Sequence, residues 1–128
     1  MTVARQDLGR KGEAEARAYL RRHGVRIVAE NFTSPVGEID LIGTAEDRLL
    51  FIEVKTRSSD AFGPPQLAVH RRKQRQIVKA AEAYLAAQRR SEVACRFDVV
   101  TVTFGRPAEP PLIEWVQDAF PAEGVRVW

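Results

Sequence analysis

Nine consecutive residues, 48–56, read Arg-Leu-Leu-Phe-Ile-Glu-Val-Lys-Thr and constrain the fold more than any other segment. Alternate side chains of a strand point to the same face, so Leu49 and Phe51 share one face, and Leu50 and Ile52 share the other. A strand that is apolar on both faces is typical of the centre of a sheet that is covered by helices on both sides. The sequence therefore predicts a central strand here, within an α/β fold.

The segments around this strand predict the order αβββαββ, with one mixed sheet and helices packed against it. The expected elements are a helix over residues 7–23, strands over 25–29, 36–42 and 48–56, a helix over 70–90, and strands over 96–104 and 112–116. Gly24 is expected to end the first helix. Residues 45–47 are expected to form a hairpin turn, and the short fifth strand is expected at the sheet edge. With no repeat or long linker, the chain is predicted to be one domain over 1–128, with a core at 7–104 and a C-terminal extension at 105–128.

Composition excludes several classes of protein. The single cysteine, Cys95, rules out an internal disulfide and points to the reducing cytosol. The first residues predict no secretory signal, and the longest apolar runs are far below the ~20 residues that span a bilayer. We therefore expect a cytoplasmic protein without a membrane partner. The net charge is only +3, but residues 1–106 hold 19 of the 20 basic residues and 13 of the 17 acidic ones, which favours a polyanionic partner.

Charged residues appear where the central strand should be dry. Glu53 and Lys55 share one face, and Glu38 and Asp40 share a face of the strand before it. Buried charges are costly unless they pair or bind a metal, so one interpretation is an ion pair of Lys55 with Glu53 or Asp40. The other is a site for Mg²⁺ or Mn²⁺, in which carboxylates hold the ion and a lysine stabilises charge on a phosphate. The spacing of Glu38-x-Asp40 and Glu53-x-Lys55 favours the second interpretation, and with it hydrolysis of a phosphodiester.

Asp40 followed by Glu53-Val54-Lys55 resembles the D-x(n)-E-x-K signature of the PD-(D/E)xK nuclease superfamily. Further blocks resemble, in order, those of the bacterial YraN family: Gly9-Arg10-Lys11-Gly12-Glu13, Gly37-Glu38-Ile39-Asp40-Leu41-Ile42, Phe51-Ile52-Glu53-Val54-Lys55-Thr56-Arg57, Phe62-Gly63, Ala80-Ala81 with Tyr84-Leu85, and Arg96-Phe97-Asp98-Val99-Val100. The resemblance covers roughly residues 8–104. It implies a restriction-endonuclease-like fold, similar to that of archaeal Holliday-junction resolvases. Ile39 stands where the superfamily's pattern has Pro.

The resemblance also implies an activity and a set of site residues. The protein would be a DNA endonuclease that depends on Mg²⁺ or Mn²⁺ and acts on branched or otherwise non-duplex DNA. Asp40, Glu53 and the backbone carbonyl of Val54 would be metal ligands, and Lys55 would be the catalytic lysine.

Three further residues are site candidates. Glu13 lies seven residues before Leu20 and eleven before Gly24, the spacing of a helical glutamate in the resolvases, which would make it another catalytic carboxylate. Glu38 fits both water-mediated contact with the metal and an ordinary surface position. Gln74 lies on the apolar stripe of the second helix, and related nucleases carry a glutamine on this helix, often with a Tyr four residues later. This chain has Val78 at that later position, so an ordinary helix position for Gln74 is favoured over a place in the site.

Basic residues crowd the start of the second helix, namely Arg71, Arg72, Lys73, Arg75 and Lys79. A helix N-terminus favours acids, so these residues are not there for helix stability. Contact with DNA phosphates and a solvated basic face both remain open. Arg57 and the loop 58–65 either line the DNA path or form an ordinary connection.

The same residues leave two rival functions open. One is a nucleic-acid-binding module that keeps the fold but does not cut, and the other is a scaffold for protein interactions. A homodimer would suit the two-fold symmetry of a four-way junction, and the sequence also leaves an unknown protein partner open.

Overall fold

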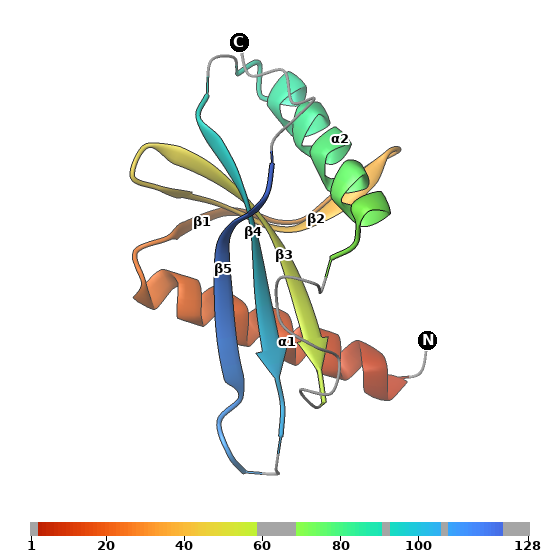
Figure 1. The fold of residues 1–128 in the computed structure, drawn as a ribbon, viewed down its shortest axis with the longest axis vertical. Coiled ribbons are helices and arrows are strands. Elements are labelled where there is room, and N and C mark those ends of the chain that lie inside the picture. Colours follow the sequence, from red (N-terminus) through yellow and green to blue (C-terminus); the bar gives the residue numbers. More distant parts are fainter. Residues whose placement is uncertain (1–2, 59–68, 91–92, 106–107, 122–128) are drawn as a thin grey trace.

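The computed structural model describes residues 3–58, 69–90, 93–105 and 108–121 (Figure 1). Its elements are α1 (Val3–Arg22), β1 (Arg26–Ser34), β2 (Gly37–Ala45), β3 (Arg48–Arg57), α2 (Arg71–Ala87), β4 (Cys95–Thr103) and β5 (Leu112–Phe120). The α/β class and the order αβββαββ are confirmed. No helix in this part of the chain is long and apolar enough to cross a membrane.

The five strands form one sheet in their sequence order, β1-β2-β3-β4-β5. β3 and β4 are parallel, and the other three neighbouring pairs are antiparallel. α2 forms the crossover between β3 and β4, as a parallel connection requires. The predicted hairpin of β2 and β3 and the edge position of β5 are both confirmed, and β3 lies at the centre.

The two helices cover opposite faces of the sheet (Figure 1). Phe51 of β3 packs with Ile77 of α2 in one buried cluster, whereas Leu50 packs with Leu20 of α1 in another. Both faces of β3 are therefore buried for most of its length, as its sequence predicts. Only near the end of β3 do charged side chains interrupt this pattern.

Local chemistry fixes the turn and the helix end that flank this core. Glu46 and Asp47, the two residues between β2 and β3, have φ of 51° and 62°, which is typical of a type I′ hairpin turn. Gly24 has φ of 91°, and the N–H of Val25 donates to the carbonyl of Leu20 at 3.0 Å. This is the glycine-dependent helix end that was expected after α1.

Two glycines allow the helices to approach the strands that carry charged residues. A Cβ at Gly12 of α1 would lie 1.8 Å from Oγ1 of Thr56 at the end of β3. A Cβ at Gly37 of β2 would lie 2.6 Å from the carbonyl oxygen of Gln76 in α2. A larger residue at either position would push a helix away from the region where Glu53 lies.

The predicted bounds were wrong for the two edge strands. β1 continues to Ser34 rather than residue 29, and β5 continues to Phe120 rather than residue 116. Each contains a polar residue with positive φ, Asn31 at 50° and Asp118 at 53°, which breaks the alternation expected of a strand. α1 also begins earlier than predicted, at Val3, and α2 ends earlier, at Ala87.

Candidate functional site

Asp40 lies where β2 separates from β3. The pairing of the two strands ends at Leu41 and Ile52. Beyond that pair, the N–H of Val54 donates to Oδ2 of Asp40 at 2.8 Å. The carboxylate replaces a backbone acceptor of the neighbouring strand, so it is fixed beside the end of β3.

Glu53 lies next to this carboxylate and is nearly buried, with 7% of the residue exposed. Its carboxyl group hydrogen-bonds that of Asp40, and burial together with the charge of Asp40 raises the pKa of Glu53 to about 8. Lys73 opposes this shift, with its Nζ 3.7 Å from Oε2 of Glu53, and so does Lys55. Burial next to another acid therefore favours the protonated form of Glu53, and the two lysines offset this only in part.

Glu13 brings a third carboxyl group from α1. Partial burial, and then the negative charge of Asp40, raise the pKa of Glu13, whereas a hydrogen bond from Asn31 and the charge of Arg17 lower it. Arg17 forms an ion pair with Glu30 of β1, which ties α1 to this edge of the sheet. Carboxyl groups from α1, β2 and β3 thus act on one another, although they are far apart in the sequence.

A cavity of about 190 Å³ opens over Glu53. It is lined by Glu53, Lys55, Val69, His70, Arg72, Lys73 and Gln76. The sequence alone does not predict that Arg72 and Gln76 lie near the acids, but they are four residues apart and so share one face of α2. The four-residue spacing would identify the second residue of this pair once the first is known to lie at the site.

The other candidates take different positions. Gln74 is not among the residues that line this cavity, because its Nε2 donates to the carbonyl of Val69 at 2.9 Å and its side chain lines a second groove. Glu38 is exposed, and it is not among the charges that act on Glu53. The side chain of Arg57 is buried at the end of β3. Of the loop 58–65, residues 59–65 lie outside the described part of the chain.

The basic residues of α2 are divided between two places. Arg72 and Lys73 line the cavity at Glu53, whereas Arg71, Arg75 and Lys79 line the second groove, between α2 and the end of β5. The sequence groups them as one cluster, and in the structure they line two different hollows.

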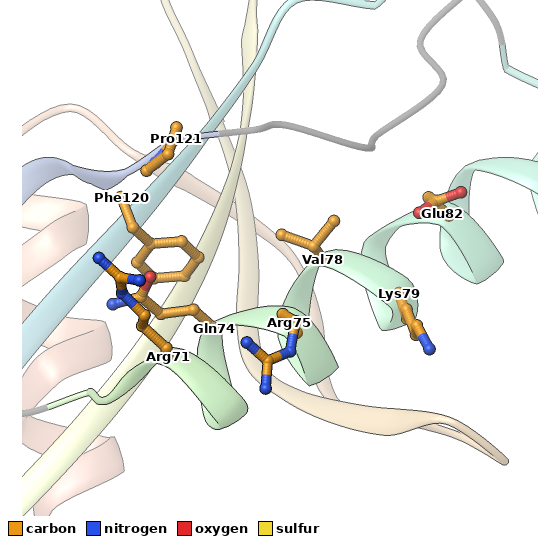
Figure 2. A pocket seen from close by; sticks show the side chains of 8 residues that line it. All are labelled: Arg71, Gln74, Arg75, Val78, Lys79, Glu82, Phe120 and Pro121. Carbon is orange, nitrogen blue, oxygen red and sulfur yellow. The ribbon is translucent and has the colours of Figure 1, made fainter.

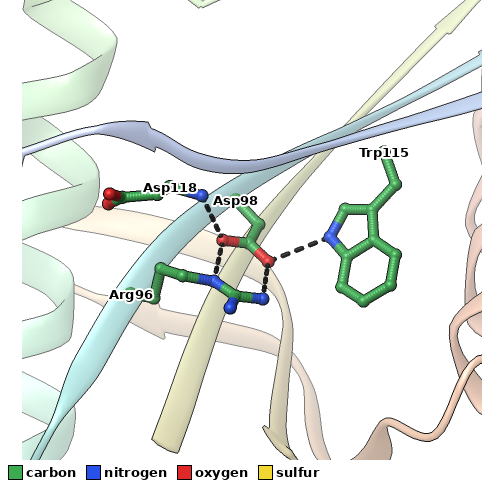
Figure 3. A network of polar contacts seen from close by, with 4 residues as sticks. All are labelled: Arg96, Asp98, Trp115 and Asp118. Carbon is green, nitrogen blue, oxygen red and sulfur yellow. Dashed lines mark hydrogen bonds and ion pairs between the residues drawn. The ribbon is translucent and has the colours of Figure 1, made fainter.

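Another carboxylate is buried in the neighbouring strand but belongs to a different kind of environment (Figure 3). Asp98 of β4 is 0% exposed and accepts hydrogen bonds from Nε and Nη2 of Arg96, both at 2.8 Å. It also accepts from Nε1 of Trp115 and from the N–H of Asp118, both at 2.9 Å. The network joins β4 to β5.

The acids at Glu53 do not form a cage made only of protein ligands. Within the described residues, no three His, Cys, Asp or Glu side chains are grouped so that they could hold a metal ion together. Mg²⁺ usually keeps several waters and takes one or two carboxylates. Asp40 and Glu53, whose carboxyl groups touch, fit that requirement.

Comparison with known proteins places these residues in a family. The model of the uncharacterised protein family UPF0102 matches residues 12–102, a span that includes Glu13, Asp40, Glu53 and Lys55. The chain belongs to the UPF0102 family. This confirms the likeness to the YraN family that its sequence blocks indicated.

Relatives named UPF0102 protein match nearly the whole chain. The protein of Geobacter metallireducens is 46% identical over 120 residues, which are 94% of this chain and 97% of that protein. The protein of Syntrophotalea carbinolica is 44% identical over 97% of this chain and 99% of its own length, and that of Moorella thermoacetica is 40% identical over 94% and 100%. These relatives share the family, whose description assigns no activity.

Proposed function

We propose that this UPF0102 protein is a metal-dependent endonuclease that hydrolyses phosphodiester bonds of DNA in the cytosol. One observation carries the proposal: the carboxyl groups of Asp40 and Glu53 touch in a nearly buried place, and Glu13 adds a third acid. Burial of Glu53 raises its pKa most, and repulsion from the negative charge of Asp40 raises it further. A divalent cation would remove that repulsion.

The ligand chemistry of the site suits Mg²⁺ or Mn²⁺. Asp40 and Glu53 would supply hard carboxylate oxygens. The carbonyl of Val54 would supply a third, because the N–H and C=O of a strand residue face the same side and its N–H already binds Asp40. When bound, such a cation polarises a phosphate and lowers the pKa of a water molecule.

The remaining residues of the site would bind the substrate and act on its charge. Lys55 lies two residues after Glu53 on the same face of β3, from which its ammonium group would stabilise charge on the phosphate oxygens or orient the attacking water. Glu13 would accept a hydrogen bond from that water. Arg72 and Lys73 at the rim of the cavity would bind the phosphate backbone.

The preferred form of DNA is a separate part of the proposal. The likeness of the sequence blocks to archaeal Holliday-junction resolvases supports branched or otherwise non-duplex DNA. A homodimer would match the two-fold symmetry of a four-way junction.

The test is a cleavage assay with labelled four-way junction, flap, single-stranded and duplex DNA, each in Mg²⁺, Mn²⁺ or EDTA. We expect cutting in the two metals and none in EDTA, with the junction or the flap cut fastest. Binding to all four substrates without cutting in either metal would contradict the proposal and favour a nucleic-acid-binding module. Absence of both binding and cutting would favour a protein scaffold.

A further inference from the structure

The basic residues of α2 lie at the end of the helix where they are least favourable. Five of its first nine residues are Arg or Lys, and its first turn contains no acid. The helix dipole places partial positive charge at this end, so these cations weaken the helix rather than stabilise it. His70, at the N-cap, contributes no side-chain hydrogen bond that would offset this effect.

Three of these cations form a row in a groove that is separate from the cavity at Glu53. The groove, hereafter the α2–β5 groove, has a volume of about 570 Å³ and includes Arg71, Arg75 and Lys79 in its lining. These residues are four apart, so they follow one another along one side of α2 at intervals of about 6 Å. Figure 2 shows them spaced along the helix, with the ring of Phe120 beside Arg71.

The chemistry of the groove fits an extended anion. Among the described residues that line it, one is acidic, Glu82, and three are cations, and Gln74 adds a neutral polar side chain. The cations are arranged in a row rather than around one point, so they suit repeated charges better than one small anion. A nucleic-acid backbone carries one phosphate per nucleotide and provides such a repeat.

The two basic surfaces of α2 face different neighbours. Arg72 and Lys73 line the cavity at Glu53, whereas Arg71, Arg75 and Lys79 line the α2–β5 groove. A strand whose phosphodiester lay at Glu53 would contact the first surface. The second surface would remain for another strand.

We propose that the α2–β5 groove binds the phosphate backbone of a second strand of the substrate, while the first strand occupies the cavity at Glu53. This inference rests on the proposed function, because it takes the cavity as the place of the cut strand. It assigns to Arg71, Arg75 and Lys79 a role that a single-stranded substrate would not use.

The test is the salt dependence of binding, measured in EDTA so that no DNA is cut. The variant Arg71→Ala/Arg75→Ala/Lys79→Ala is compared with the wild type on a forked DNA and on a short single strand. Each phosphate contact makes the negative slope of log K against log salt steeper by about 0.9. Loss of three contacts should therefore make the slope for the fork shallower by about 2 to 3. Affinity for the fork should fall about tenfold or more, and the slope for the single strand should change by less than about 1.

The matched control is Arg21→Ala/Arg22→Ala/Arg26→Ala, which removes three exposed arginines at the end of α1 and the start of β1. It should leave both slopes near the wild-type values, and thermal melting should show that both variants are folded. An unchanged slope for the fork in the groove variant would overturn the inference. An equal loss for fork and single strand would also overturn it, because one strand would then contact both surfaces.

The outcome is independent of cleavage. If the wild type binds the fork but does not cut it in Mg²⁺, and the slope still falls in the groove variant, hydrolysis is wrong and the second backbone site stands. If the wild type cuts in Mg²⁺ and the slope does not fall, the proposed function stands and the groove is a solvated basic face.

Discussion

Asp98 in β4 and Glu53 in β3 are both buried carboxylates of the central sheet, but their surroundings differ. Asp98 is surrounded by donors: the guanidinium of Arg96, the indole of Trp115 and a backbone N–H all bind it (Figure 3). Glu53 instead hydrogen-bonds another acid, Asp40, and its ion pair with the partly exposed Lys73 is a 3.7 Å contact. The protein supplies hydrogen-bond donors and a positive charge to Asp98, whereas Glu53 is buried beside a second acid.

We interpret this as the difference between a structural acid, Asp98, and an acid of the proposed active site, Glu53. A buried charge persists when the protein itself supplies enough hydrogen bonds and opposite charge. Where it does not, the group takes up a proton, and the raised pKa of Glu53 has this cause. A ligand that brings positive charge can take the place of that proton. We therefore expect substitutions at Asp98 to change stability and substitutions around Glu53 to change activity and pH dependence.

The largest effect is expected for Asp98→Ala. The substitution removes a fully buried carboxylate and leaves the partly buried guanidinium of Arg96 and the N–H of Trp115 without their acceptor, which costs about 3–5 kcal/mol. Urea unfolding at neutral pH measures the loss. Asp7→Ala, at an exposed residue of α1, is the control and should change the free energy of unfolding by less than about 0.5 kcal/mol. Equal losses in both variants would show that the network at Asp98 is not structural.

Lys55→Ala tests the proposed catalytic role of the residues around Glu53. Because Lys55 is proposed to act on phosphate charge and not on the metal, its loss should lower single-turnover cleavage about 100-fold. Calorimetric titration with Mn²⁺ should give nearly the wild-type affinity. If metal binding is lost and the rate per metal-bound enzyme is unchanged, the role given to Lys55 is wrong.

Glu53→Gln should alter how stability depends on pH. The pKa of Glu53 is about 8 in the folded protein and near 4.5 in the unfolded chain, so between these values the folded state holds a proton that the unfolded state has lost. The stabilisation is complete below about pH 4.5 and disappears as the pH rises through 8. Between pH 5 and 9 in EDTA, the wild type should lose about 4 kcal/mol more than the glutamine variant, at about 1.4 kcal/mol per pH unit up to pH 8. Parallel curves for the two proteins would contradict the raised pKa.

Lys73→Ala should have the smallest effect. Lys73 lowers the pKa of Glu53 across a half-exposed contact, which is worth less than about 1 kcal/mol. Its removal should move the midpoint of the pH–stability curve upward by a few tenths of a pH unit. Lys79→Ala, on the same helix but in the α2–β5 groove, is the control and should leave the midpoint unchanged. The same shift in both variants would mean that the effect is one of general charge.

Much of the core could be predicted because the responsible signals are local. The apolar faces of β3 predict its central position, and Gly24 predicts the end of α1. The convergence of Asp40 and Glu53 follows from a hairpin whose turn residues are visible in the sequence. In each case, a few neighbouring residues decide the outcome.

The remaining features depend on contacts between distant parts of the chain. Asp118 continues β5 with positive φ while its N–H binds Asp98 on another strand, which no local pattern reveals. Helical periodicity indicates that Gln74 and Gln76 point in different directions, but not which of them meets Glu53. The position of α2 on the sheet decides this, and it places Gln76 at the cavity and Gln74 in the groove.

The most direct test of the account is the cleavage of its best DNA substrate in Mg²⁺ by the wild type and by Asp40→Asn. The asparagine keeps an oxygen that can accept the N–H of Val54, but it removes the negative charge proposed to hold the metal. We predict that cleavage falls below detection, while the melting temperature in EDTA and the affinity for DNA stay near the wild-type values. Cleavage by Asp40→Asn at the wild-type rate would show that the cluster of Asp40 and Glu53 is not the active site.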